Sequence, residues 1–399
     1  MKLLTVQDSR TQKEFLRLPL KIYKDDPLWI QPWDHDVEAV FDKSKNKYFR
    51  HGELERWILV NDQNKTIGRV AAFINKREAK KHDQPTGGMG FFECVDNQEA
   101  AFMLFDRCKE WLQARGMEAM DGPINFGEKD KFWGLLVKTS TAPLYGMNHH
   151  PMYYQKFFEA YGFQTFYEQY CFSRGVLDDI DPRYTDMADR LMENPEYTFP
   201  RFSKKKLEKY AEDFREIYNR AWSKTPAFQP MRKIQAVALI NQLKPILDED
   251  TIVFCYHNGE PVGFFISIPE LNQVIKHLNG KFNWWSKVKF FYHLKIKRVN
   301  KLFGMVYGVV PEYQRKGVEA AMVRSAQFTH QRIKRYDQFE MGWLGDFNPT
   351  MMRIADMLYC DRSKILVTYR KLFDETKPFK RRPIIGKKWV PREEREKQN

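Results

Sequence analysis

The sequence predicts a mixed α/β fold, α+β in the sense of a mixed sheet, in which one unit occurs twice in tandem. The chain has 399 residues, which is long for one domain and comfortable for two. In each half, strand patterns and amphipathic helical patterns follow in the same order, β-β-β-α-β-α-β. We therefore expect an N-terminal domain at 1–177, an acidic, Pro-bearing linker at 178–200, a C-terminal domain at 201–375 and a basic tail at 376–399.

The first copy is expected to start with two strands that flank the polar turn "NDQNKT" within 55–75, followed by a third strand at 87–96. Residues 97–116 have the pattern of a helix, because apolar side chains recur every three or four positions and Gly116 stands where helices commonly end. The strand "MEAMDGPINF" and a short helix at 152–163 complete this copy.

The second copy is expected to open with a helix at 206–222 and to continue with two strands around an Asn-Gly turn at 250–269. Its remaining elements follow in the order strand, helix, strand, helix, strand, carried by "LFGMVYGVV", "KGVEAAMVRSAQFTHQRIKR", "YDQFEMGW", "NPTMMRIADML" and "KILVTYRKLF".

The composition restricts the class of protein and its partners. Hydrophobic residues make up 43% of the chain, which excludes general disorder. Lys and Arg (66) outnumber Asp and Glu (52), so polyanionic partners are favoured: nucleic acid, an anionic membrane face, an acidic carrier protein or a phosphorylated cofactor. The five cysteines have no CxxC spacing, so we expect no disulfide framework, no metal site and a reducing cytoplasm. No apolar run is long enough to span a membrane.

One loop stands out in the second copy, within "GVVPEYQRKGVEAAM" at 308–322. A strand that passes through a glycine-bearing loop into a helix presents unpaired N–H groups and the positive end of the helix dipole, which suit phosphate oxygens. Gln314, Arg315 and Lys316 add donors and charge, and Gly317 allows close approach to the backbone. The alternative is a plain connection between two elements.

The repeated element order, with this loop after the third strand of the unit, resembles the GCN5-related N-acyltransferase (GNAT) superfamily. Gln314 and Gly317 match its pyrophosphate loop Q/R-x-x-G-x-G/A, whereas Glu319 stands in place of the last small residue. A carboxylate roughly 6 Å from a pyrophosphate costs about 3 kcal/mol per charge at an effective dielectric constant near 20. The resemblance therefore implies acyl-CoA as cosubstrate, with acyl-phosphopantetheine on an acyl carrier protein as the alternative.

Longer segments are similar to a narrower group, the YghO-like family that includes bacterial ceramide synthase. They are "GFFECVDN", "DGPINFGEKDKFWGLLV", "MYYQKFFEAYGF", "LNQVIKHLNGKF", "GVVPEYQRKGVEAAM" and "EMGWLGDFNPTMM", and they span about 50 to 373 in order. This resemblance implies an N-acyltransferase that transfers an acyl group from a thioester to a primary amine, namely a sphingoid long-chain base.

The resemblance also assigns site residues. Glu340 is the candidate general base, and its alternative reading is a strand-end carboxylate paired with an Arg. Backbone N–H groups near Val309 or Val310 are expected to hold the thioester oxygen, and Val318 and Asn348 are expected to contact the donor. Ala355 replaces the tyrosine that usually protonates the leaving thiolate, so Tyr359, one turn later, is the substitute.

The first copy has "ECVDNQEAA" where the second has the glycine loop. Because it lacks glycine and carries acids, we interpret this copy as degenerate, shaping the acceptor pocket. His149 or His150, in "MNHHPMYY", assists proton transfer if its loop covers the second copy's site; otherwise both are ordinary loop residues. No further ligands at zinc spacing accompany them.

An insert at 271–303 interrupts the second copy and contains no Asp or Glu. Its basic residues alternate with an apolar stripe, and two tryptophans precede the expected helix. The basic residues are Lys287, Lys289, Lys295, Lys297, Arg298 and Lys301, the stripe is Val288, Phe291, Tyr292, Val299 and Leu302, and the tryptophans are Trp284 and Trp285. Each Lys or Arg near anionic lipid adds about 1 kcal/mol of attraction. We expect peripheral membrane contact through 284–303; the alternative is a core-facing helix with a solvated basic side.

The expected function is therefore acyl transfer to a lipid amine by a cytoplasmic protein, peripheral on the inner face of the membrane. One alternative is an N-acetyltransferase that uses acetyl-CoA on a small amine or a peptide. The other is a non-catalytic GNAT-like protein that binds membranes. Nucleic acid is not an expected partner, because the basic residues concentrate in an insert with apolar aromatics rather than along a recognised reading motif.

Overall fold

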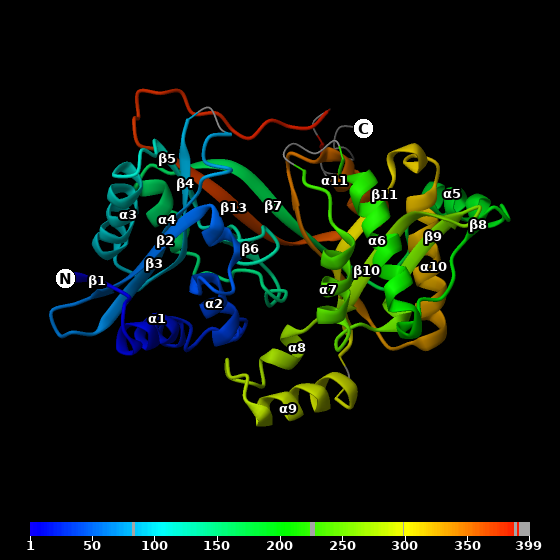
Figure 1. Cartoon of the computed structure of the whole chain (residues 1–399), viewed down its shortest axis with the longest axis horizontal. Helices are drawn as coiled ribbons and strands as arrows, with labels where there is room; N and C mark the ends of the chain where they lie inside the picture. Colours follow the sequence, from blue (N-terminus) through cyan, green and yellow to red (C-terminus); the bar gives the residue numbers. More distant parts are fainter. Residues whose placement is uncertain (82–83, 224–227, 298, 387–388, 391–399) are drawn as a thin grey trace.

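The structure is a computed structural model that describes residues 1–81, 84–223, 228–297, 299–386 and 389–390. It is a mixed α/β arrangement in which one large mixed sheet runs through both halves of the chain (Figure 1). The strands of the sheet follow the order β1-β2-β3-β4-β5-β13-β7-β12-β11-β10-β9-β8, and β6 pairs beside this path with β13.

The predicted succession of strands and helices is confirmed in both halves. The first half consists of β1 (Lys2–Thr5), α1 (Ser9–Ile22), α2 (Asp34–Phe41), β2 (Gly52–Val60), β3 (Thr66–Asn75), β4 (Thr86–Cys94), α3 (Gln98–Gln113), β5 (Ala119–Gly122), β6 (Leu135–Thr139), α4 (Tyr154–Ala160) and β7 (Gln164–Gly175). The second half consists of α5 (Pro182–Met192), β8 (Tyr197–Thr198), α6 (Leu207–Ala221), α7 (Lys233–Leu243), β9 (Ile252–His257), β10 (Glu260–Pro269), α8 (Asn272–Ile275), α9 (Trp284–Lys295), β11 (Lys301–Val309), α10 (Val318–Ile333), β12 (Gln338–Gly345), α11 (Pro349–Met357) and β13 (Asp361–Leu372).

The two halves exchange their last strands. β7, which ends the first half, pairs antiparallel with β12 of the second half, and β13, which ends the second half, pairs antiparallel with β5 of the first. β7 and β13 also pair with each other and run side by side across the middle of the molecule (Figure 1). The predicted boundary at 177 follows the sequence repeat, but each half of the sheet contains a strand from the other half.

The segment predicted as a linker, 178–200, contains α5 and β8. One of its prolines, Pro182, and one of its acids, Asp181, mark the start of a helix instead of a loop. Pro182 occupies the first turn of α5, and the side chain of Asp181 accepts a hydrogen bond from the backbone N–H of Arg183 at 2.9 Å. α5 packs beside α10, so this segment is part of the second half.

Helices cover both faces of the sheet in each half. In the first half, Trp57 and Leu59 of β2 face the apolar cluster formed with α3, whereas Ile58 faces α1. In the second half, Phe264 of β10 packs on Phe214 of α6, with ring centroids 4.8 Å apart. The neighbouring residue of β10, Phe265, faces α10 on the other side of the sheet. Alternate residues of each strand are therefore buried against opposite helical layers.

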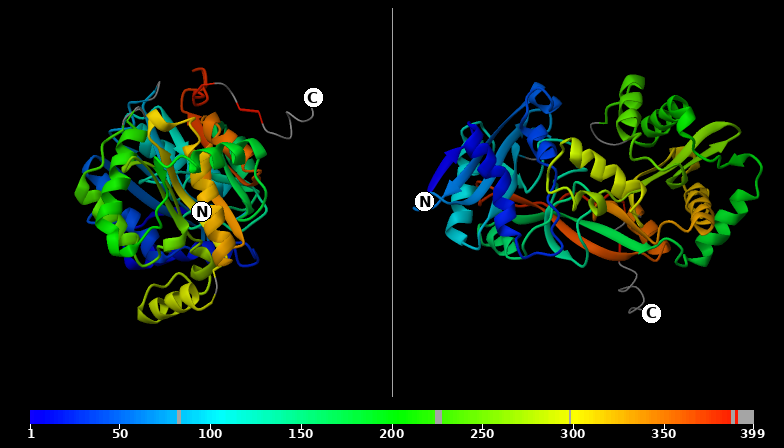
Figure 2. Two further views of the ribbon diagram at one scale, coloured as in Figure 1. Left: turned by 90° about the vertical axis from the view of Figure 1, so that its right-hand side faces the viewer. Right: turned by 90° about the horizontal axis from the view of Figure 1, so that it is seen from below.

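The insert forms two helices, and α9 lies at the lower edge of the molecule, where it protrudes below the sheet (Figures 1 and 2). Trp284 and Trp285 are the first residues of α9 and do not precede it as expected. The predicted apolar stripe divides into two parts, because Val299 and Leu302 lie beyond the helix and are buried. Lys301 is also largely buried, and the predicted basic residue Arg298 lies outside the described residues.

The first part of the tail follows the body of the protein. The backbone N–H of Arg382 bonds to the carbonyl of Phe166, and the indole N–H of Trp389 donates to Asp356 at 2.8 Å. Residues 391–399 of the predicted tail lie outside the described residues. In the part of the chain that the structure covers, no helix is long and apolar enough to cross a membrane.

Candidate active site

A gap opens between the parallel strands β11 and β12. They pair only from Lys301 with Gln338 to Gly304 with Met341, although both strands continue beyond these residues. On their far sides, β11 stays paired with β10 and β12 stays paired with β7. The facing edges of 305–309 and 342–345 are therefore not paired with each other and can bond to an extended ligand placed between the strands, except at the Val309 carbonyl, which accepts a hydrogen bond from Gln314.

A bulge in β11 lies at the closed end of the gap. Ile266 of β10 is opposite Val306, but the next residue, Ser267, is opposite Gly304, so Met305 is an extra residue in β11. Met305 is 38% exposed, more than its neighbours in the strand. The bulge turns the backbone at the point where the two strands separate.

The register of β10 and β11 decides which backbone N–H groups face the gap. Val310 donates its N–H to the carbonyl of Val262 at 3.0 Å, so this group points toward β10. In an antiparallel pair, N–H groups alternate between the two sides of the strand. Val309 and Tyr307 therefore point their N–H groups away from β10 and toward the gap. Of the two residues expected to hold the thioester oxygen, Val309 is suitably placed and Val310 is not.

The loop at the open end of the gap has the backbone that the sequence predicts for a helix start. Gly317 has φ +92° and caps α10, and Arg315 also has a positive φ, of +63°. A Cβ atom on Gly317 would lie 2.9 Å from Cγ of Met187 in α5. The glycine is thus required by its φ and by close packing on α5, and its role in admitting a ligand stays a prediction.

The other predicted loop residues surround this open end. Gln314, Arg315 and Lys316 are exposed, and Nε2 of Gln314 donates to the carbonyl of Val309 at 3.0 Å. Val318, in contrast, is fully buried in the core and presents no side chain to the gap. Asn348 precedes α11 at the end of β12, and its N–H bonds to the carbonyl of Gly345. Because β11 and β12 are parallel, Asn348 and the loop after β11 lie at the same end of the sheet.

Glu319 points back to the start of its own helix. Its carboxylate accepts a hydrogen bond from the backbone N–H of Arg315 at 3.3 Å, and burial raises its pKa. Burial, followed by the charge of Glu319, raises the pKa of Tyr184 in α5. The Glu319 carboxylate therefore takes one of the donors that a phosphate group would use.

Glu340 lies in a buried ionic cluster, on the face of the sheet opposite to α10. Its carboxylate accepts hydrogen bonds from Lys364 at 2.5 Å and Ser363 at 2.5 Å, and it is also bonded to Lys301. Burial alone would raise the pKa of Glu340, but the ammonium groups of Lys364 and Lys301 outweigh it and lower the pKa. Three donors hold both oxygens, so the alternative reading of a paired strand-end carboxylate fits better than a general base, with lysines as partners in place of an arginine.

The other predicted catalytic residues lie at different places. Tyr359 follows the end of α11 and is 37% exposed, while Ala355 is buried against β7. His149 is paired with Asp26 of the first half, with Nε2 2.7 Å from Oδ2. His150 accepts the backbone N–H of Leu136, and burial lowers its pKa to about 3. The contacts of both histidines are thus with first-half residues.

Several residues near the gap are not predicted as site residues from the sequence. Met187 and Tyr184 lie in the segment interpreted as a linker, and their helical spacing around Ala188 and Leu191 was the available signal. Lys301 was grouped with the exposed lysines of the insert, although it directly precedes the apolar strand residues Leu302 and Phe303. Lys364 gave no signal, because its role depends on the pairing of β13.

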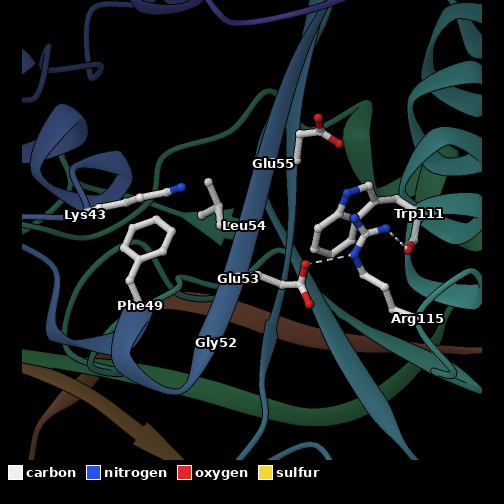
Figure 3. Close-up of a pocket in the computed structure, with 8 residues that line it drawn as sticks. All are labelled: Lys43, Phe49, Gly52, Glu53, Leu54, Glu55, Trp111 and Arg115. Carbon is white, nitrogen blue, oxygen red and sulfur yellow. Dashed lines mark hydrogen bonds and ion pairs between the residues drawn. The ribbon is translucent and has the colours of Figure 1, made fainter.

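A separate surface depression of about 330 Å³ lies on the first half, lined by β2 and the end of α3 (Figure 3). Nε of Arg115 is 3.0 Å from the carboxylate of Glu53, and the guanidinium lies 3.9 Å from the ring centroid of Trp111. The main charges of this depression therefore neutralise each other.

Among the described residues, no three or more His, Cys, Asp or Glu side chains form a group that could hold a metal ion.

Comparison with known proteins shows similarity over almost the whole chain, although no protein-family model matches it. The chain is 24% identical over 374 residues to a bacterial ceramide synthase of Caulobacter vibrioides, covering 90% of this chain and 94% of the relative. It is 23% identical over 364 residues to protein YghO of Escherichia coli, covering 90% and 92%.

Two solved structures share the fold. A tandem GNAT protein from the clavulanic acid biosynthesis pathway has a TM-score of 0.52 at 10% identity, covering 95% of this chain and 99% of that one. A GCN5-related N-acetyltransferase from Sphaerobacter thermophilus has a TM-score of 0.50 at 12% identity, covering 95% and 97%. The expected resemblance is confirmed: the chain has the tandem GNAT fold and is similar along most of its length to bacterial ceramide synthase and YghO.

Proposed function

We propose that this protein is an N-acyltransferase that transfers an acyl group from a thioester to the primary amine of a sphingoid long-chain base. The observation that carries the proposal is the gap between β11 and β12, which has free backbone edges, a bulge at its closed end and a helix start at its open end. The similarity to a protein named bacterial ceramide synthase supports the choice of acceptor.

In this proposal the thioester arm lies between the strands as an additional β-like segment. The N–H groups of Tyr307 and Val309 bond to the arm, and the loop at 314–317 lies beside its phosphate. The neutral amine attacks the thioester carbon, and the C–N bond forms as the C–S bond breaks. The proton lost by the amine ends on the departing sulfur, so the products are an amide and a thiol.

The donor is acyl-CoA or an acyl-phosphopantetheine on an acyl carrier protein. Exposed Arg315 and Lys316 suit phosphate in either case, and also suit the surface of an acidic carrier. Glu319 disfavours the second phosphate of CoA more than the single phosphodiester of a carrier, because its carboxylate lies at the helix start. Because of Glu319, we expect the carrier-bound donor to bind at this site more tightly than acyl-CoA.

The position of α9 supports contact with a membrane that contains the lipid amine. Its outer face carries Trp284, 66% exposed, and Trp285, 68% exposed, next to exposed lysines. On its inner face, Phe290 packs on Trp33 of the first half with ring centroids 5.7 Å apart, which fixes the orientation of the helix. Exposed aromatics beside lysines in a segment without acidic residues suit the interface of an anionic bilayer.

The test of acyl transfer uses the full chain with palmitoyl-CoA or palmitoyl-carrier protein and sphinganine, followed by detection of the amide by mass spectrometry. We expect amide formation that requires both substrates. A control with acetyl-CoA and small amines distinguishes a short-chain acetyltransferase. If neither donor yields amide with a panel of lipid amines, the proposed substrates are wrong, whereas the fold is unaffected.

A further inference from the structure

A cavity of about 50 Å³ lies between α10 and the sheet, on the face opposite to Glu340. Its lining includes Phe265 and Ser267 of β10, Leu302 of β11, Phe339 of β12, and Ala326 and His330 of α10. One water molecule requires about 15 Å³ measured in a comparable way, so the cavity has room for several groups of that size. None of these residues has a role in the transfer step proposed above.

The lining favours an aliphatic ligand, because most of its side chains are apolar and its polar side chains Arg174 and Thr251 are already bonded to the protein. Arg174 donates to the carbonyls of Gly175, Leu358 and Asp178. Thr251 donates its hydroxyl to the carbonyl of Ser267 at 2.7 Å. Nδ1 of His330 is the exception, because it is buried without a hydrogen-bond partner among the described residues, and burial lowers the pKa of this histidine.

The cavity is adjacent to the closed end of the gap. Leu302 and Phe339, which both line the cavity, are opposite each other in the last paired stretch of β11 and β12. A Cβ atom on Gly304, where the pairing ends, would lie 2.7 Å from Cζ of Phe339. The Phe339 ring therefore lies against the backbone at the closed end of the gap, with the cavity on its other side.

We infer that this cavity receives the hydrocarbon tail of the donor's acyl group and limits its length. The tail enters from the closed end of the gap by displacing the Phe339 ring, and it ends against Ala326 and His330 of α10. The inference rests on the proposed function, since it requires the thioester to lie in the gap. Each methylene that leaves water for this cavity strengthens binding about fourfold, the factor that corresponds to about 0.8 kcal/mol.

The experiment measures binding of CoA and of S-alkyl-CoA thioethers of increasing chain length to the full protein by isothermal titration calorimetry. Thioethers cannot transfer their chain, so binding is measured apart from chemistry. We expect the affinity of the wild-type protein to rise about fourfold per methylene until the cavity is filled, and then to level off. Ala326→Leu adds three carbon atoms to a cavity with room for about three such groups, so it is expected to remove most of this rise without changing the affinity for CoA itself.

Two further variants complete the design. Phe339→Leu enlarges the cavity and is expected to extend the rise to longer chains, the opposite direction to Ala326→Leu. Gln331→Leu introduces the same side chain on the exposed face of α10, away from the cavity, and is expected to leave the series unchanged. Thermal unfolding of each variant confirms that it is folded.

The outcomes separate this inference from the proposed function. A rise that Ala326→Leu shortens, in a protein that forms no amide, supports the tail site and removes the proposed reaction. Amide formation with an affinity series that is flat, or that Ala326→Leu leaves unchanged, removes the tail site and keeps the reaction. If neither CoA nor any thioether binds and palmitoyl-carrier protein yields no amide, both are overturned, because no donor then reaches the gap.

Discussion

Lys364 of the exchanged strand β13 donates a buried hydrogen bond of 2.5 Å to Glu340 of β12. Lys364 belongs to β13, which pairs with the first half, and Glu340 belongs to β12, where the gap begins. Side-chain exposure is 1% for Lys364 and 0% for Glu340. The ion pair therefore joins the wall of the gap to the strand that enters the other half of the sheet.

Removing one partner of this buried pair is expected to be costly. Lys364→Met leaves the Glu340 charge with Lys301 as its remaining cation, and we expect a loss of about 3 kcal/mol or more in the free energy of unfolding by urea. The pKa of Glu340 is lowered from 4.5, so its contribution is present above pH 4.5 and is lost as the pH falls through the lower folded-state value. The variant's deficit should therefore shrink in acid; an equal deficit at all pH values would contradict this account.

Glu319 is expected to weaken the binding of CoA. Glu319→Gln removes the charge and retains an oxygen that can accept from the N–H of Arg315, so we expect CoA to bind roughly tenfold tighter in calorimetry. The matched control is Glu312→Gln, which neutralises an exposed carboxylate in the same loop. An equal gain in both variants would indicate a general charge effect and remove the specific role of Glu319.

Gly317 is expected to tolerate no side chain. Gly317→Ala imposes φ +92° on alanine and places Cβ 2.9 Å from Met187, so we expect a loss of about 2 kcal/mol or more in unfolding free energy and weaker thioester binding. Gly259→Ala is the control, because Gly259 has φ +85° and no neighbour within 4 Å of the added atom. Gly259→Ala should lower the unfolding free energy only through its unfavourable positive φ, by about 1 kcal/mol. Equal losses would show that packing on α5 contributes nothing.

Glu270 is expected to make stability depend on pH near neutrality. This buried carboxylate accepts N–H groups of Tyr145, Asn272 and Gln273, and burial raises its pKa to about 7 from 4.5. Because the folded-state pKa is the higher one, its contribution is full below pH 4.5 and is lost as the pH rises to about 7, by up to about 3 kcal/mol.

Glu270→Gln tests this dependence by urea unfolding across the same pH interval. In Glu270→Gln the amide NH₂ faces one backbone N–H group, which should lower the free energy of unfolding by an amount that does not depend on pH. Its free energy of unfolding should not fall between pH 4.5 and 7 as that of the wild type does. If wild type and variant curves run parallel through this interval, another group is responsible for the slope.

The outer face of α9 is expected to bind anionic vesicles. Replacing both Trp284 and Trp285 with Ser should reduce flotation with phosphatidylglycerol vesicles at least tenfold, and high salt should weaken the wild-type protein's binding. The control is Phe328→Ser, which removes an exposed aromatic from α10 on another part of the surface. Binding that depends on neither tryptophan nor salt would refute the proposed contact.

Local patterns were sufficient to predict the strands and helices of the repeated unit, but they missed helices such as α1, α5 and α7, and they did not predict the partners of the strands. Strand and helix periods, together with positions such as Gly116 and Gly317, depend on neighbouring residues in the sequence. The pairing of β13 with β5 joins Tyr369 to Gly122, and no local pattern encodes a contact over that separation. For the same reason the sequence predicts a catalytic role for Glu340. Its partners Lys301 and Lys364 belong to β11 and β13, and nothing in the local sequence shows that these strands bring their lysines to Glu340.

The exchange of β7 and β13 affects how the protein is made. β5 pairs with β4 on one side, but its partner on the other side, β13, is absent until Leu372 has left the ribosome, so the first half cannot complete its sheet before then. Translation that stops anywhere before β13 leaves a nascent chain with an unpaired strand edge, which is prone to aggregation. Productive folding of this protein therefore awaits the synthesis of β13.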